Sequence, residues 1–339
     1  MSLKKIAEMT GVSPSTVSRV LNHTSPSCAS KELQDKIFEA ARSIGYRPNE
    51  NARMLRKQNV QNTNQKENVH HISIILARIR NLKDDPFFYE LFRCLEEELF
   101  QNRVTVDQVI YADDEPVSNI TKSQGIIILG RCSQKLLGHI LAQTKNVIGI
   151  WRNSMDYKLD EVVCDGRKAA ELAMEYLISL GHKNIAYIGD CSYESRYIGY
   201  CNSFINHHIP LNYEWIRQTD QTGEAGGAAF LDLLNKSDDF TAVFCANDVT
   251  AITVLQCIQT LGRKLKRKIS VISIDDIEES QNTTPYLTTI HIPKAEMAHM
   301  AVTMLIDRME KKHTEAVRIE FPCRMMKRDS CYKTERQVR

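Results

Sequence analysis

From His70 onward, short apolar runs typical of β-strands alternate with longer runs that have helical periodicity. ISIILARI is followed by a helical stretch over 86–101, GIIILG by one over 134–143, and NVIGIW by one over 167–180. Because strands joined by helices run parallel and are covered on both faces, this order predicts an α/β fold with doubly wound parallel sheets. A region of about 270 residues is large for one core, so we expect two sheets.

No apolar run approaches the roughly 18 residues that a membrane-spanning helix requires, and the N-terminus begins in charged, helix-like sequence. We therefore expect a cytoplasmic protein without membrane contact. The ten cysteines are scattered and form no CxxC pair, which predicts reduced and mostly buried thiols. The adjacent histidines at 70–71 and at 207–208 cannot face one metal ion, so we predict no metal site.

The sequence also lacks the GxGxxG, GxxxxGK[ST], GxSxG and HExxH motifs of dinucleotide, phosphate and catalytic sites. Asp275 and Asp276 are adjacent, which does not suit an acid and a base placed around one reacting centre. We therefore predict no catalytic residues, no cofactor and no enzyme activity.

Charge is unevenly distributed along the chain. Residues 1–57 contain ten Lys and Arg against five Asp and Glu, a net +5, whereas residues 58–339 contain 34 against 37, a net −3. A small basic module joined to a mildly acidic body indicates that the first part meets phosphate groups. A solvated terminal domain is the alternative that charge alone leaves open.

The basic part has the pattern of a small unit of three helices. Residues 3–9 predict a helix, Gly11 allows the positive φ that ends it, and Ser13 caps a second helix that begins at Pro14. A third helix is predicted over 30–45, where apolar residues recur at helical spacing.

The outer face of the second helix carries short polar side chains and one arginine. Such a face fits the DNA major groove, because hydroxyl groups reach phosphates and base edges and arginine forms paired bonds to guanine. A structural bundle with a polar outer face is the alternative. We predict DNA contacts by Ser13, Pro14, Ser15, Thr16, Ser18, Arg19 and Asn22.

Two runs in this part, IAEMTGVSPSTVSRVLN at 6–22 and GYRPNENARMLRK at 45–57, resemble the DNA-binding headpiece of the LacI/GalR family of bacterial transcription regulators. The resemblance implies a helix-turn-helix headpiece over 1–57 whose hinge helix, 49–56, orders on operator DNA. Leu55 would be the apolar wedge that enters the minor groove, although on residue type alone it is a packing residue. The hinge residues expected to contact DNA are Asn49, Arg53, Leu55 and Arg56.

The resemblance continues after a polar linker at 58–69. SLGHKNIAYIG, FTAVFCAND, ISVISIDDI and PYLTTIHIPKAEMA resemble the regulatory core of the same family, which is similar to periplasmic sugar-binding proteins. This implies an effector-binding and dimerisation core over 70–331, built as two lobes joined by three crossings, with a tail at 332–339. The expected lobes are about 70–162 plus 292–322 for lobe one and about 163–291 plus 323–331 for lobe two.

Ligands of parallel sheets bind beyond the carboxyl ends of the strands, so the residues that follow each strand are candidates. Asn247 and Asp275 follow two apolar runs, and an amide or carboxylate can bond two neighbouring sugar hydroxyls. Asp248 and Asp276 stand beside them, but both also suit helix capping, and Asp248 suits capping better than a ligand role.

The family resemblance adds further candidates. Arg196 matches the arginine that holds ligand oxygens, although a structural salt bridge is its alternative role, and Gln221 falls at a lining position that is often aromatic. Trp151 replaces an aspartate of many relatives and could stack on a sugar face or exclude one. The predicted effector-binding residues are Arg196, Asn247, Asp275, Asp85, Phe87, Phe88, Trp151 and Gln221.

Together these features predict a homodimeric repressor that binds pseudo-palindromic operator DNA. DDPFFYELF and GIIILG are most similar to the evolved β-galactosidase repressor and Gram-positive galactose repressor branches, which implies a galactose or galactoside inducer of a carbohydrate-utilisation operon. A co-repressor of the purine or sugar phosphate class, or a sugar-binding protein without a regulatory role, are the alternatives. No leucine heptad follows Ser330, which favours a dimer over a larger oligomer.

Overall fold

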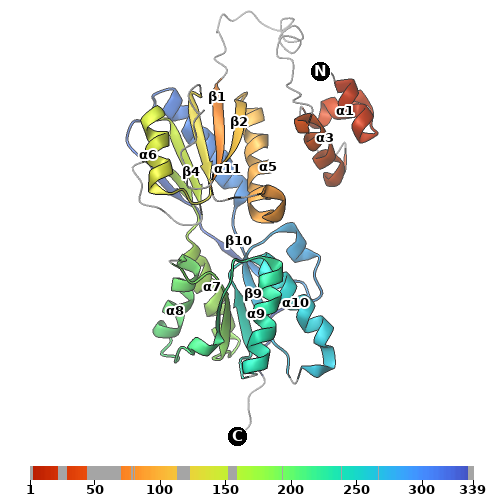
Figure 1. Cartoon of the computed structure of the whole chain (residues 1–339), viewed down its shortest axis with the longest axis vertical. Coiled ribbons are helices and arrows are strands. Elements are labelled where there is room, and N and C mark those ends of the chain that lie inside the picture. Colours follow the sequence, from red (N-terminus) through yellow and green to blue (C-terminus); the bar gives the residue numbers. More distant parts are fainter. Residues whose placement is uncertain are drawn as a thin grey trace, which may run out of the picture. The chain divides into compact units, whose positions relative to one another are not determined.

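The computed structural model describes residues 3–21, 29–43, 70–77, 79, 81–112, 123–151, 159–192, 194–237, 239–265 and 267–334. These residues fall in two units, Met1–Glu67 and Asn68–Arg339. The first is an all-α headpiece and the second an α/β core of two lobes (Figure 1). No helix in the described ranges has both the length and the apolar character needed to cross a membrane.

The described part of the headpiece contains α1 (Leu3–Thr10), α2 (Pro14–Leu21) and α3 (Lys31–Ser43). Gly11 adopts a φ of +70° in the tight turn between α1 and α2. Ser13 caps α2, because its Oγ accepts a hydrogen bond from the Thr16 N–H at 3.1 Å. The predicted continuation of α3 to Gly45 lies outside the described residues.

Side chains from all three helices form one small hydrophobic core, and each of them is at most 7% exposed. Val17 lies on the inner face of α2 and is fully buried, so the opposite face of this helix points to solvent. The core residues are Ile6, Ala7, Val17, Val20, Leu21, Ile37, Ala40 and Ala41.

Lobe one contains, in its described part, a six-stranded sheet of order β11-β5-β4-β3-β1-β2 with every pair parallel. One face is covered by α6 and the other by α5 and α11 (Figure 1). The elements are β1 (His71–Ala77), η1 (Leu82–Asp84), α5 (Pro86–Gln101), β2 (Thr105–Ala112), β3 (Gly125–Leu129), α6 (Gln134–Gln143), β4 (Val147–Trp151), β5 (Asp160–Val163), α11 (Lys294–Met309) and β11 (Arg318–Glu320).

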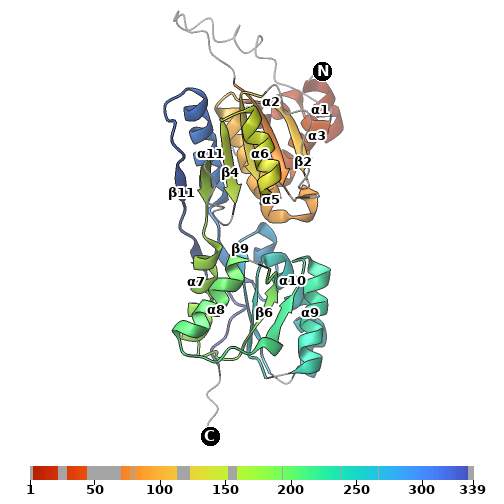
Figure 2. The ribbon, with the colours of Figure 1, turned by 60° about the vertical axis from the view of Figure 1, so that its left-hand side comes forward.

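Lobe two contains, over the residues described, a second six-stranded sheet of order β12-β10-β9-β8-β6-β7. One face is covered by α7 and α8 and the other by α9 and α10 (Figure 2). The elements are α7 (Gly166–Ser179), β6 (Ile185–Gly189), α8 (Ser195–Asn206), η2 (Tyr213–Trp215), β7 (Ile216–Gln218), α9 (Gly223–Lys236), β8 (Ala242–Cys245), α10 (Asp248–Leu261), η3 (Gly262–Lys264), β9 (Ser270–Asp275), η4 (Glu278–Gln281), β10 (Thr288–His291) and β12 (Arg324–Met326).

One strand departs from the parallel order that the sequence predicts. β12 pairs with β10 in the antiparallel sense. The reason is its origin, because β12 enters lobe two directly from β11 of lobe one, whereas the parallel strands of lobe two run toward lobe one.

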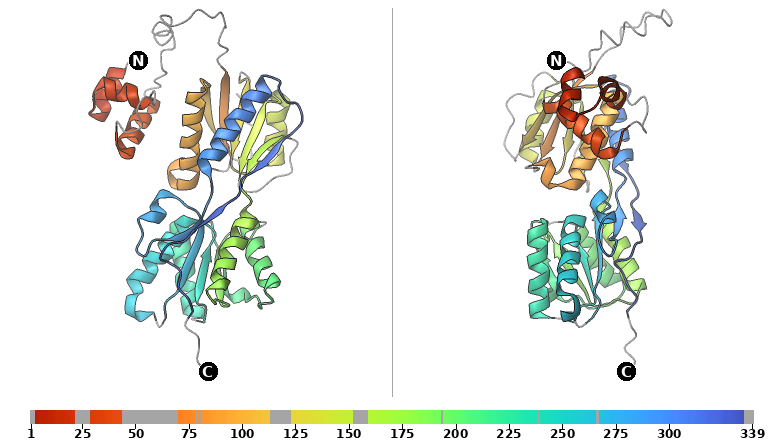
Figure 3. Two further views of the ribbon diagram at one scale, coloured as in Figure 1. Left: turned by 180° about the vertical axis from the view of Figure 1, so that it is seen from behind. Right: turned by 90° about the vertical axis from the view of Figure 1, so that its right-hand side faces the viewer.

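Within the described residues, the chain passes between the lobes at 164–165, 292–293 and 321–323. Figure 3, seen from behind, shows the blue segment after β11 as it runs from one lobe to the other. The first and third crossings lie side by side, because the Phe321 N–H donates to the Val163 carbonyl at 2.9 Å.

The start of the predicted tail differs from the expectation. Residues 332–334 pack on lobe two, where the Tyr332 N–H donates to Ser270 Oγ at 2.8 Å and the Thr334 N–H donates to the Leu180 carbonyl at 3.0 Å. These backbone groups find partners on lobe two, so the core extends to at least Thr334.

Gly149→Ala is expected to lower the free energy of unfolding by about 1–3 kcal/mol, because an added Cβ would lie 1.9 Å from the Trp151 ring. Gly138→Ala in the same lobe is the control. No atom lies within 4 Å of its added Cβ, and alanine favours a helix by up to about 1 kcal/mol. Urea unfolding followed by tryptophan fluorescence measures both, and equal changes would contradict this packing.

Candidate functional site

The N-terminal end of α2 presents hydroxyl groups and a positive side chain. Ser13, Ser15 and Arg19 are exposed and Thr16 is half-buried, and Pro14 is exposed at the first helical position. Ser13 Oγ lies 2.7 Å from Ser15 Oγ and 2.9 Å from Thr16 Oγ1. Because helix N-termini attract anions, this surface suits phosphate and base-edge contacts.

The remaining predicted DNA contacts lie outside what the structure describes. The hinge helix predicted over 49–56 therefore stays a prediction from the sequence. The residues concerned are Asn22, Asn49, Arg53, Leu55 and Arg56, together with the side chain of Ser18.

Arg196, in the first turn of α8, lies at the centre of a hydrogen-bonded cluster in lobe two and is 2% exposed. Its Nε and Nη2 each donate to one carboxylate oxygen of Glu194 at 3.0 Å. Nη1 donates to the Ala246 carbonyl at 2.6 Å, and Nη2 donates to Gln221 Oε1 at 2.8 Å. Burial acts to lower the pKa of Arg196, but the charge of Glu194 outweighs it and raises the pKa above its ordinary value.

Asn247 joins this cluster through Gln221. Its Nδ2 donates to the Gln221 carbonyl at 3.0 Å, and Gln221 itself adopts a φ of +64°. The buried carboxylate of Asp275 is close enough to raise the pKa of Arg196 further. The structure therefore brings four predicted residues together at the carboxyl ends of the lobe-two strands: Arg196, Gln221, Asn247 and Asp275.

The predicted capping role of Asp248 is wrong by one residue. Asn247 caps α10, because its Oδ1 accepts from the Thr250 N–H at 3.1 Å. Asp248 is the first helical residue and is fully buried, where its carboxylate accepts from Thr289 Oγ1 at 2.6 Å and from the Ile277 N–H at 2.9 Å. Burial, with a further contribution from the charge of Asp275, raises the pKa of Asp248 to about 7.

Asp276 forms ion pairs and does not cap the following helix. η4 has no side-chain cap, and the Asp276 carboxylate instead contacts Arg328 Nη2 and, at 2.8 Å, His291 Nδ1. Burial acts to raise the pKa of Asp276, but the hydrogen bonds from His291 and Arg328 lower it to about 2. This carboxylate is therefore committed to structure.

The predicted lobe-one residues lie at the start of α5. Asp85 caps this helix, because its Oδ1 accepts from the Phe88 N–H at 3.2 Å. Phe87 is 3% exposed and meets the half-buried Phe88 edge-to-face, with 5.2 Å between ring centroids. One of the two aromatic rings thus belongs to the core, as the spacing of adjacent residues predicts.

Lys294 joins the two groups of residues, and sequence reasoning missed it. Its Nζ donates to the carbonyl of Asp275 at 2.7 Å and of Asp276 at 3.1 Å, both in lobe two. The same Nζ lies 3.0 Å from Glu90 Oε2 on α5 and 5.5 Å from the Phe87 ring centroid. A signal was available, since a cation at the first position of a helix opposes the helix dipole and requires acceptors.

Trp151 does not belong to this group. It is 3% exposed and packs across Gly149 among the core residues on the α6 face of the lobe-one sheet. Because Gly149 has no side chain, the indole fills the space two residues away on the same face of β4. This position does not support the predicted contact with an effector.

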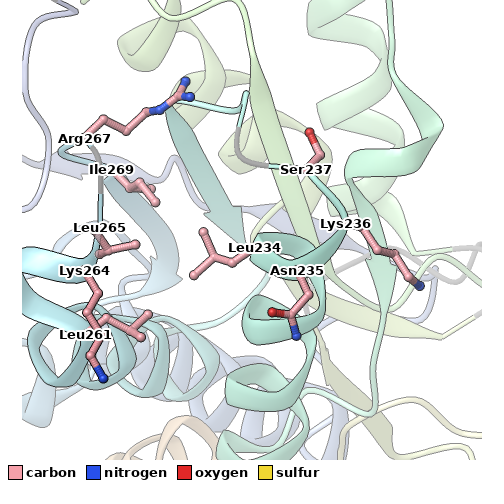
Figure 4. A pocket seen from close by; sticks show the side chains of 9 residues that line it. All are labelled: Leu234, Asn235, Lys236, Ser237, Leu261, Lys264, Leu265, Arg267 and Ile269. Carbon is pink, nitrogen blue, oxygen red and sulfur yellow. The ribbon is translucent and has the colours of Figure 1, made fainter.

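A pocket elsewhere in lobe two has a different character. It lies near the last turns of α9 and α10. Its lining combines apolar side chains, among them Leu234 and Leu265, with polar ones: Asn235, Lys236, Ser237, Lys264 and Arg267. Figure 4 shows the amino groups of Lys236 and Lys264 directed away from the pocket. These charges do not converge on one point, and the pocket lies away from Arg196.

Comparison with known proteins places these features in a family. Residues 2–49 match the bacterial regulatory proteins of the lacI family, and residues 174–331 match the periplasmic binding protein-like domain. The chain thus combines a lacI-family domain with a periplasmic binding protein-like domain. The resemblance seen in the sequence and the expected fold class, a helix-turn-helix headpiece with a two-lobed α/β core, are thereby confirmed.

Relatives of this chain align over nearly its whole length. The probable HTH-type transcriptional repressor ExuR of Bacillus subtilis is 29% identical over 97% of this chain and 98% of its own length. The HTH-type transcriptional repressor PurR of Photorhabdus laumondii is 29% identical over 97% and 96%. The chain is accordingly a DNA-binding transcriptional regulator with a ligand-binding type of core.

Solved structures of regulators share the fold. The transcriptional regulator CelR in complex with cellobiose has a TM-score of 0.68 at 21% identity and covers 97% of this chain and 99% of its own. The lac repressor dimer bound to operator and the anti-inducer ONPF has a TM-score of 0.67 at 22% identity and covers 98% and 99%.

Arg328→Ala is expected to lower the free energy of unfolding by about 3 kcal/mol at pH 7, because it removes the arginine partner of a buried carboxylate. The folded-state pKa of Asp276 is lowered to about 2, so its contribution is present above the ordinary value of 3.8 and is lost as the pH falls from there toward 2. The deficit of the variant should therefore shrink at pH 3 in urea unfolding.

Lys312→Ala is the control for this experiment, because Lys312 makes exposed ion pairs with Asp307 and Glu310. Such pairs contribute little to stability, because water and salt screen them. An Arg328→Ala deficit that is the same at pH 7 and pH 3 would contradict the assigned role of Asp276.

Proposed function

We propose that this chain is a transcriptional repressor that binds pseudo-palindromic operator DNA as a homodimer and releases it when a small sugar binds between the lobes. A galactose or galactoside that induces a carbohydrate-utilisation operon is the proposed effector. The observation that carries the effector assignment is the joint position of Arg196, Gln221, Asn247 and Asp275 at the strand ends of lobe two. We refer to these four residues as the effector cluster.

The chemistry of the effector cluster suits a polyol. Amide, carboxylate and guanidinium groups bond hydroxyls, and leaving one such group unpaired costs about 1–3 kcal/mol, which favours a ligand with several hydroxyls. The contacts described above occupy four of the five N–H groups of Arg196. A sugar oxygen would therefore take the fifth N–H or replace Gln221 as an acceptor.

Lobe one supplies the apolar side of the proposed site. The half-buried Phe88 ring, next to the capping carboxylate of Asp85, offers a surface for the C–H face of a sugar. A ligand held by both lobes stabilises their closed arrangement, and differential binding of this kind shifts DNA affinity by about 1–3 kcal/mol. The induction proposed here requires that the closed form bind operator more weakly.

A purine or sugar phosphate that acts as a co-repressor is the second candidate. It is favoured by the alignment of relatives named PurR over the whole chain. The charged guanidinium of Arg196 and the aromatic ring of Phe88 suit such a ligand as well. A sugar-binding protein without a regulatory role is disfavoured by the lacI-family match of residues 2–49.

Arg19→Ala is expected to weaken binding to operator DNA, obtained by selection from random sequences, by about 1–3 kcal/mol and to relax specificity at one base pair in each half-site. Lys36→Ala, which removes an exposed charge from α3, is the matched control and should weaken selected and unrelated DNA alike. Fluorescence anisotropy measures both variants. Unchanged specificity in Arg19→Ala would contradict the assignment of α2 to the surface that reads base pairs.

Leu55→Ala tests the proposed wedge of the hinge helix. Operator binding should weaken by about 1–3 kcal/mol, because the kink that the wedge stabilises in the minor groove is lost. Effector affinity should stay unchanged, since Leu55 belongs to the headpiece. An equal loss of operator and effector affinity, measured by anisotropy and calorimetry, would exclude the wedge.

Arg196→Ala is expected to retain operator binding and to lose the response to the effector, because the central donor of the effector cluster is gone. Arg217→Ala is the control, since Arg217 in β7 pairs with Asp232 outside the cluster. Gln221→Ala serves as a second variant if the loss of the arginine partner of Glu194 prevents folding of the first. Operator titration with and without galactose or a β-galactoside is the measurement, and a full response in both cluster variants would refute the assignment.

A further inference from the structure

Two cysteines that are far apart in the sequence meet where the lobes are joined. Cys164 directly follows β5 in the first crossing, and Cys323 directly precedes β12 in the third. β11 pairs with β5 up to Glu320 and Val163, so the two crossings continue from adjacent strands. Figure 2 shows the segment after β11 descending beside the segment that joins β5 to α7.

Each of the two thiols shifts the pKa of the other, and their surroundings differ. Cys164 is 1% exposed, whereas Cys323 is partly exposed to solvent. The hydrogen bond from Cys164 lowers the pKa of Cys323 and raises that of Cys164. Cys323 is therefore the more accessible of the two sulfurs and the one whose pKa is lowered, and Cys164 is the buried one.

Nearby carboxylates act against the lowered pKa of Cys323, but each of them forms an ion pair with a positive side chain. Asp165 and Glu320 both act to raise the pKa of Cys323. Asp165 lies 3.6 Å from Arg167 Nη2, and Glu320 lies 2.6 Å from Lys168 Nζ. These ion pairs reduce the negative potential around the thiols.

The other cysteines differ from this pair. Among the described cysteines whose pKa departs from the ordinary value, Cys323 is the one in which it is lowered. In the others, the pKa is raised. Burial is the main cause except in Cys164, where the hydrogen bond to Cys323 is the larger cause. Those raised chiefly by burial are Cys94, Cys191, Cys201, Cys245, Cys257 and Cys331.

We propose that Cys164 and Cys323 form a peroxide-sensitive dithiol that closes to a disulfide between the first and third crossings. The Cys323 thiolate attacks one oxygen of hydrogen peroxide, the O–O bond breaks, and a sulfenic acid and water result once a proton is taken up. The Cys164 sulfur then attacks the Cys323 sulfur and expels a second water. Two thiols and one peroxide thus give one disulfide and two waters.

The disulfide would join the two crossings covalently. Lobe motion requires these segments to move against each other, so the oxidised chain would hold one lobe arrangement. A reducing compartment would keep the pair as thiols, and an oxidant would close it transiently, which is the usual use of disulfides in such a compartment. This proposal concerns the chain itself and stands independently of the effector's identity.

The test uses the full chain treated with one to a few equivalents of hydrogen peroxide, blocked with N-ethylmaleimide, digested without reductant and analysed by mass spectrometry. We expect a linked peptide pair containing Cys164 and Cys323, the loss of two thiols per chain, and reversal by dithiothreitol. The thermal midpoint should rise by several degrees on oxidation. A linked pair that involves other cysteines, or no linked pair while thiols are consumed, would overturn the proposal.

Single variants separate the two roles. Cys164→Ser should leave Cys323 as a sulfenic acid that dimedone traps, whereas Cys323→Ser should show no dimedone adduct at Cys164. Cys201→Ser, which removes a thiol on α8, is the control and should form the same disulfide as the unmodified chain. Dimedone labelling at Cys164 in Cys323→Ser, or a thermal shift that persists in both single variants, would contradict the assignment.

Discussion

The buried ammonium group of Lys294 links the two lobes. A buried cation is costly unless acceptors surround it, and Lys294 finds them in the carbonyls of Asp275 and Asp276 and in the Glu90 carboxylate. Asp275 and Asp276 have φ values of +130° and +49°, which L-residues rarely adopt. Bonds to Lys294 stabilise this strained loop, and Glu90 also accepts the Glu278 N–H at 2.8 Å. Relative motion of the lobes must therefore rearrange the contacts of Glu90 and Lys294.

The charge of Arg196 in the effector cluster is already paired within the chain. Arg196 is held by both oxygens of Glu194, and it is further bonded to Gln221. A ligand bound at the proposed site would therefore exchange hydrogen bonds with the protein, and its affinity would depend on how well its oxygens replace the acceptor that Gln221 provides. Because the guanidinium plane is fixed by Glu194, the direction of the available N–H is fixed as well, which selects ligands by geometry.

Local signals in the sequence predicted the helices and strands well, whereas contacts between residues far apart in the sequence were not predicted. Ser13 predicts the start of α2, because a capping side chain acts within three residues. The alternation of apolar and helical runs predicted both sheets. The packing of Trp151 against Gly149 was not predicted, because strands in a parallel sheet are buried on both faces and the pattern does not tell which face a side chain occupies. The missing side chain at Gly149, on the same face of β4, was the signal that could have indicated this packing. The pairing of Lys294 with Glu90 joins different elements of the fold, and no local pattern encodes it.

We propose that the core of this chain senses a sugar. A thermal-shift screen of the full chain against monosaccharides, disaccharides, sugar phosphates and purines tests it most directly, since a ligand at 100 times its Kd adds about 2.7 kcal/mol of stability. We expect a higher unfolding midpoint with galactose or a β-galactoside. A rise with purines or sugar phosphates alone would contradict the sugar assignment and support the co-repressor class.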